Sequence, residues 1–116
     1  MREQWASLVA AAATSIAVAH ASEPASIEIT VGWANVTAER MEQEVTAPLE
    51  SRLKALPRVV QVRSITTNGT SKLKVIYPNE AKCSDVEAIT AVLIGAQTAL
   101  PSGASTPKIT DGGAKC

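Results

Sequence analysis

The chain has 116 residues, of which 46% are hydrophobic and 19% are charged, and this length allows one domain with a single hydrophobic core. Its 11 basic residues balance 11 acidic ones, so no net field attracts nucleic acid, and we expect no nucleic-acid partner. With no Phe, one Tyr and two Trp, the core must be aliphatic and offers little surface on which a base, a sugar or a flat cofactor could stack.

Residues 1–21 are typical of an export signal. Arg2 precedes an apolar run from Ala6 to Ala19, and Ala19-His20-Ala21 has the small-x-small form that signal peptidase accepts. A membrane anchor is the alternative, but the run of 14 residues falls short of the roughly 20 that cross a bilayer. We therefore expect cleavage after Ala21, a single α+β domain over residues 22–116 with its core at about 27–110, a periplasmic or secreted location, and no membrane insertion of the mature chain.

The mature chain has few groups for catalysis or metal binding. Loss of residues 1–21 removes His20, the only histidine, so a His-dependent triad and an imidazole zinc site are excluded, and we expect no enzyme and no cofactor. Cys83 and Cys116 lie 33 positions apart, which excludes a CxxC motif. In an oxidising compartment they fit either one intrachain disulfide or two unrelated thiols, of which Cys116 could pair between molecules.

The first predicted elements are a strand and a long helix. Apolar residues alternate with polar or small ones over Ile27–Trp33, as in a strand with one buried face. Thr37 is suited to cap a helix that runs to about Leu56. Pro48 inside that helix removes a hydrogen bond and crowds the preceding turn, so we expect a kink near Glu44–Pro48. The apolar positions of the helix recur at spacings of four, four, four and three: Met41, Val45, Leu49, Leu53 and Leu56.

A hairpin and a second helix follow. Val59–Thr66 and Lys72–Tyr77 are predicted strands, and Asn68-Gly69 between them tolerates the positive φ angles of a tight turn. Ser84 and Glu87 predict a capping box at the start of the second helix. An apolar seam continues along this helix at spacings of three, four, three and four: Val86, Ile89, Leu93, Ala96 and Leu100.

The last predicted element is a short edge strand over Pro107–Thr110. The order β-α-β-β-α-β then predicts an α+β fold of the ferredoxin-like, split βαβ type, with an antiparallel sheet and two helices on one face. The carboxylates of the first helix interleave with basic residues and are interpreted as a solvated face with pairs such as Glu50 and Lys54. These acidic residues are Glu39, Glu42, Glu44 and Glu50.

The string VTAPLESRLKALPRVVQVRS from Val45 to Ser64 resembles the stretch of resistance-nodulation-division (RND) efflux permeases that follows their first transmembrane helix. In that family a helix with a Pro-Leu-Glu step ends at Leu-Pro and leads into a Val-rich strand. The Asn68-Gly69 hairpin, the helix ending in ALPSG and the closing TPKI extend the resemblance over about Ile27 to Ile109. The residues that fall on the pattern of the string are Pro48, Leu49, Glu50, Leu56, Pro57, Val59, Val62, Arg63 and Ser64.

The chain also departs from the pattern of the permeases. They commonly have Tyr-Pro-Gly-Ala-Ser before the first helix, where this chain has Trp33-Ala34-Asn35-Val36-Thr37. Asn35 in place of Gly is a mild change, because Asn is among the few residues that accept a left-handed backbone. The resemblance implies a porter subdomain, AcrB/AcrD/AcrF-like, as a stand-alone truncated chain without the membrane helices and intramembrane charges that couple transport to protons.

We therefore expect a non-enzymatic, transport-associated or protein-interaction module that cannot pump alone, with further copies or efflux-complex components as partners. The resemblance places the second helix near the threefold axis of the porter ring, which makes Val86, Ile89, Leu93 and Ala96 candidates for a contact between copies. The alternative is that these residues cover the sheet of their own chain. A second interpretation of the whole chain is a periplasmic small-ligand or metal-binding ferredoxin-like domain, for which the CxxC motif or His-rich loop is missing.

Overall fold

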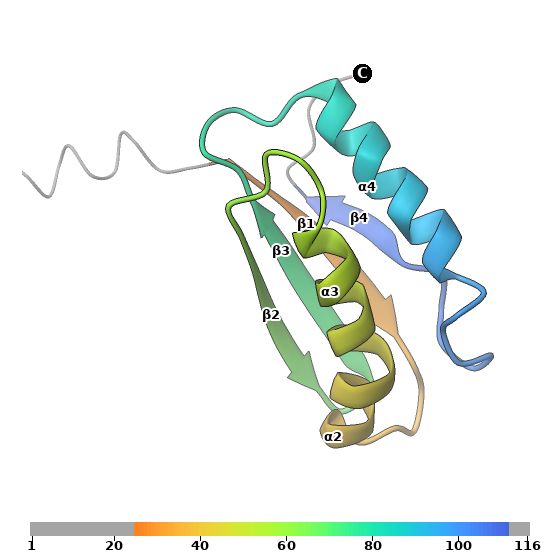
Figure 1. Ribbon diagram of the computed structural model, residues 1–116. Coiled ribbons are helices and arrows are strands. Elements are labelled where there is room, and N and C mark those ends of the chain that lie inside the picture. The colour runs from red at the N-terminus through yellow and green to blue at the C-terminus, as the bar shows by residue number, and fades with distance from the viewer. Residues whose placement is uncertain (1–24, 112–116) are drawn as a thin grey trace, which may run out of the picture.

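The structure is a computed structural model and describes residues 25–111. Neighbouring strands lie in the order β2-β3-β1-β4, and every neighbouring pair is antiparallel. Both helical segments cover the same face of this sheet (Figure 1), so the predicted ferredoxin-like, split βαβ fold is confirmed. The elements are β1 (Ser26–Gly32), α2 (Ala38–Met41), a π-helical turn η1 (Glu42–Thr46), α3 (Ala47–Lys54), β2 (Gln61–Thr67), β3 (Thr70–Ile76), α4 (Cys83–Ala96) and β4 (Lys108–Asp111).

The core lies between the sheet and the helices. On β1 the predicted alternation holds, because Ile27, Ile29 and Val31 are buried while the residues between them are half-buried. The predicted stripe of the first helix is buried from Met41 to Leu53, whereas Leu56 is only half-buried. The helix ends at Lys54, two residues before the predicted end, because a residue that precedes proline disfavours the α conformation. Full burial of each such aliphatic side chain contributes roughly 1.5–3 kcal/mol to folding.

The first helical segment widens where Pro48 was expected to disturb it. Between α2 and α3 the backbone forms the π-helical turn Glu42–Thr46. In a regular α-helix the ring of Pro48 would meet the carbonyl of Glu44, and a single π turn inside a helix is a known way to accommodate such an irregularity. The turn also buries Val45 and Thr46 together, and the Thr46 hydroxyl shares hydrogen bonds with Thr66 at 2.9 Å and Ser71 at 2.7 Å.

The hairpin between β2 and β3 also fixes the start of the first helix. Thr37 caps this helix as predicted, since its hydroxyl accepts a hydrogen bond from the Arg40 N–H at 3.3 Å. The Asn68 side-chain oxygen accepts a second one from the Ala38 N–H at 2.8 Å. Of the two turn residues only Gly69 has a positive φ, 80°. The turn therefore needs the left-handed backbone conformation at Gly69 and not at Asn68.

The start of α4 differs from the prediction. The helix begins at Cys83 after Lys82, and the Asp85 carboxylate accepts a hydrogen bond from the Lys82 backbone N–H at 2.8 Å. The predicted capping box of Ser84 and Glu87 is therefore wrong, and Asp85 takes the reciprocal position. Within residues 25–111 neither helical segment has the length and hydrophobicity needed to cross a lipid bilayer.

Candidate functional site

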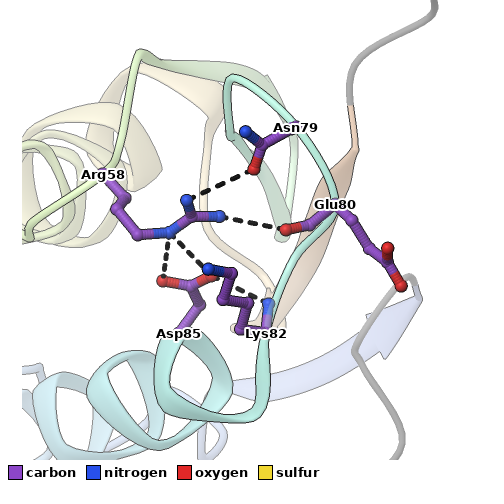
Figure 2. Close-up of polar contacts among 5 residues, drawn as sticks. All are labelled: Arg58, Asn79, Glu80, Lys82 and Asp85. Atoms are coloured by element: carbon purple, nitrogen blue, oxygen red, sulfur yellow. Dashed lines mark hydrogen bonds and ion pairs between the residues drawn. The ribbon is translucent and has the colours of Figure 1, made fainter.

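A polar cluster joins the loop after α3 to the start of α4 (Figure 2). The Arg58 guanidinium donates from Nε to both carboxylate oxygens of Asp85, at 3.2 Å each. Its Nη1 donates to the Asn79 side-chain oxygen at 3.3 Å, and its Nη2 donates to the Glu80 carbonyl at 3.0 Å. The Asp85 side chain is 5% exposed and that of Arg58 is 29% exposed, so the pair is largely shielded from water.

The backbone of Arg58 has an unusual conformation. Its φ is +71°, and within residues 25–111 the only other non-glycine residue with a positive φ is Asn35, at 63°. For a residue with a Cβ the left-handed region costs roughly 1–2 kcal/mol. The cost is offset by the hydrogen bonds of the guanidinium, which also lies 5.7 Å from the centroid of the Tyr77 ring. A strained residue with a fully engaged side chain indicates that the position of that side chain matters.

The electrostatics of the cluster oppose proton exchange near neutral pH. Burial by itself would raise the pKa of Asp85, but the Lys82 N–H and the hydrogen bonds and charge of Arg58 outweigh it and lower this pKa below its ordinary value. Burial, followed by the charge of Asp85, raises the pKa of Tyr77 to about 12 against the opposing charge of Arg58. The Tyr77 hydroxyl is buried and has no hydrogen-bond partner within residues 25–111. The cluster is therefore a fixed ion pair suited to holding two segments together.

Sequence reasoning missed this cluster. Arg58 and Asp85 are 27 positions apart, and no local pattern in the sequence connects them. The available signal was the position of Arg58 directly after Pro57, where a helix has just ended and the chain must reverse toward β2. A side chain at such a point can reach back over the ends of the neighbouring elements.

The seam predicted on α4 faces the interior of its own chain. Ile89, Leu93 and Ala96 are buried in the core, and Val86 is half-buried against it. These residues therefore cover the sheet, and their contact with a second copy stays a prediction. The opposite face of α4 exposes Ile94, whose side chain is 65% exposed. This outer face consists of Glu87, Thr90, Ala91, Ile94 and Gly95.

The other candidate residues lie apart from the cluster or pair locally. Cys83 is the half-buried first residue of α4, but Cys116 lies outside the described residues, and their disulfide stays a prediction. Glu50 pairs with Lys54 at 3.4 Å, as expected for a solvated helix face. Residues 25–111 contain no group of three or more His, Cys, Asp or Glu side chains arranged to hold a metal ion.

Comparison with known proteins identifies the family. The profile of the AcrB/AcrD/AcrF family matches residues 7–114. The chain belongs to this family. Its match to the AcrB/AcrD/AcrF profile begins inside the apolar run that the sequence assigns to an export signal. No curated protein sequence matches the chain significantly.

The fold of this AcrB/AcrD/AcrF-family chain recurs in a solved structure. A crystal structure described as that of a heavy metal efflux pump, crystal form II, superposes with a TM-score of 0.66 at 24% sequence identity. The match covers 94% of this chain and 12% of the pump chain. The likeness therefore supports the fold of one small part of a much longer protein.

Proposed function

We propose that this chain is a non-enzymatic periplasmic domain of RND porter type that acts through protein contacts and does not pump by itself. Membership of a transporter family supports a role linked to transport. The chain spans 12% of the length of the efflux pump that it resembles, so the activity of a whole pump is not assigned to it. The cluster of Arg58 and Asp85 adds no group that exchanges protons near neutral pH.

The outer face of α4 is the observation that carries this proposal. Between Asp85 and the end of the helix at Ala96, the only charged residue is Glu87. Ile94 and Ala91 are exposed, with Ile94 beside a hollow that it shares with Ile109 of β4, and a Cβ added to Gly95 would meet no atom within 4 Å. From Ala91 to Ala96 the helix has no polar side chain on either side, and a helix that is apolar all round is typically buried. Small residues beside an exposed Ile allow a second helix to approach closely, and a further copy is the partner that the family resemblance favours.

A charge placed on this face tests the proposal. We expect Ile94→Lys to weaken association of copies by roughly tenfold or more, since it introduces a charge at the centre of an apolar contact. Ile65→Lys is the matched control, because Ile65 is 68% exposed and lies on β2, away from α4. Sedimentation velocity over a concentration series measures both variants. Equal association constants for the two variants would remove the outer face of α4 from the proposal.

The periplasmic location has its own test. Export with cleavage after Ala21 gives a mature protein that begins at Ser22. We expect intact-mass measurement of periplasmic material to give the mass of residues 22–116. A protein that keeps residues 1–21 and sediments with the membrane fraction would contradict this location and support an anchored chain.

A further inference from the structure

The face of the sheet away from the helices is rich in unpaired positive charge. Arg63, Lys72, Lys74 and Lys108 are exposed at alternating positions of β2, β3 and β4. Within residues 25–111 none of these four side chains forms an ion pair. Arg63 and Lys74 stand directly opposite each other on neighbouring strands, and like charges at such positions destabilise a sheet. Glu28, opposite Lys74 on β1, is the nearest acid in the register, and Asp111 stands opposite Glu28.

A hollow of 430 Å³ lies beside this pair at one end of the sheet. Arg63 and Lys74 line it together with Gln61, whose side chain has no hydrogen-bond partner within residues 25–111. Its remaining wall is largely apolar and includes Val60, which is 64% exposed. Basic groups beside an apolar wall suit a carboxylate that is carried on a partly apolar surface.

A second hollow, of 390 Å³, is shallow and nearly flat, and it has the opposite charge. Glu39, Glu42 and the neighbouring Gln43 line it at the start of the first helical segment. The one basic residue in this stretch, Arg40, is already engaged, because it pairs with Glu44 at 2.6 Å and lies 4.9 Å from the centroid of the Trp33 ring. Glu42 accepts only a hydrogen bond from the Thr66 hydroxyl at 3.0 Å. The charge of these two carboxylates is therefore not neutralised within the described part of the chain.

The two hollows lie at opposite ends and on opposite faces of the domain. In the strand register, Gln61 stands beside Ile76 and Ser26 at one end of the sheet, and Thr67 stands beside Thr70 and Gly32 at the other. Seven-residue strands separate these ends by roughly 20 Å. The basic hollow opens on the face without helices, whereas the acidic hollow lies at the helical layer. One copy can therefore use both hollows at once, each toward a different neighbour.

We propose that copies of this chain associate head to tail, with the Glu39 and Glu42 end of one copy bound in the Arg63 and Lys74 hollow of the next. The opposite charges of these two surfaces make a second copy the occupant that fits. Such a contact is heterologous and builds a ring or an open chain, depending on whether the rotation between copies closes. It does not use α4, so it is separate from the contact of the proposed function.

Removal of the charge on each side provides the test. Arg63→Gln/Lys74→Gln neutralises the basic hollow, and Glu39→Gln/Glu42→Gln neutralises the acidic one. Every protein in this test carries Ile94→Lys, which removes the α4 contact. At low salt we expect sedimentation velocity to show association of the chain with both charged surfaces intact and monomers for each variant alone. A 1:1 mixture of the two variants should form a dimer that does not grow further, because each keeps the one surface that the other needs. Raising the salt to 0.3 M should weaken the association of the chain with both surfaces intact by roughly tenfold, since the contact is electrostatic.

Two controls keep the result specific. Lys72→Gln/Lys108→Gln makes the same change of charge on the same face but outside the hollow, and it should leave most of the association intact. Circular dichroism confirms that each variant is folded. The proposal is overturned if the Ile94→Lys chain with both charged surfaces intact stays monomeric at low salt, if the mixture stays monomeric, or if the control pair has the same effect as the hollow pair. Association that is insensitive to salt and lost only in Ile94→Lys would support the α4 contact and also overturn this one.

Discussion

Replacing Arg58 separates the strain of its backbone from the contacts of its side chain. Breaking a buried ion pair costs about 3–5 kcal/mol, and because the Arg58 side chain is 29% exposed, we expect Arg58→Ala to cost about 2–3 kcal/mol. Arg58→Gly loses the same contacts but relieves the positive φ of 71°, which costs a non-glycine residue about 1–2 kcal/mol. Glycine is also freer in the unfolded chain, which offsets about 0.5–1 kcal/mol of this relief.

The glycine variant should therefore be more stable than the alanine variant by about 0.75 kcal/mol, the midpoint of a range of about 0–1.5 kcal/mol, which is the reverse of the order expected in a helix or strand. For a domain of this size the difference corresponds to roughly 4 °C in melting temperature, which thermal unfolding followed by circular dichroism resolves. Asn35, with a φ of 63°, is the matched control, because its side chain forms no hydrogen bond within residues 25–111. Asn35→Gly should be near neutral, and Asn35→Ala should cost about 1 kcal/mol. An alanine variant at 58 that is more stable than the glycine variant would refute the left-handed assignment.

Two further predictions address the core and the ion pair. Leu49→Ala should lower the free energy of unfolding by about 2–4 kcal/mol, whereas Lys74→Ala, on the exposed face of β3, should change it little; equal urea midpoints would contradict the packing of the first helix. Asp85 has a lowered pKa in the folded state, so its contribution is present above its unfolded pKa of about 4 and is lost as the pH falls through the folded value. The stability difference between the native chain and Asp85→Asn should therefore shrink in urea titrations below about pH 4, and a difference that stays constant down to pH 2 would contradict the role of the charged pair.

The fold followed from patterns that are local in the sequence. Alternation over residues 27–33 located β1, and the stripe from Met41 to Leu53 located the first helical segment, because burial of one face imposes a period on each element. Pro48 indicated where the helix would be disturbed but not the form of the disturbance. A kink and a π turn both accommodate a proline, and the structure has a π turn in which the Thr46 hydroxyl bonds to Thr66 and Ser71 on the sheet.

The outer face of α4 and the basic hollow were harder to predict from the sequence than the fold. The seam on α4 was recognised, but an apolar spacing does not say whether a helix turns that side to its own sheet or to a neighbour. The outer face around Ile94 became visible only once Ile89 and Leu93 were placed in the core. The basic hollow was missed for a similar reason. Arg63 and Lys74 are 11 positions apart, and they come together only through the register of the hairpin.

Both ends of the first helical segment depend on residues far along the chain. Its start receives the Asn68 side chain at the Ala38 N–H, across 30 positions, and the loop after its end is tied by Arg58 to Asp85, across 27 positions. Hydrogen bonds and ion pairs of this kind form only after the hairpin and α4 have packed. They therefore stabilise the assembled fold and not the isolated helix. Local sequence could therefore predict that the helix exists, whereas its boundaries and the left-handed residue behind it belong to the tertiary structure. The ion pair of Arg58 and Asp85 also couples the orientation of α4 to the loop before β2. Its removal should therefore change the outer face of α4 and also lower the stability of the domain.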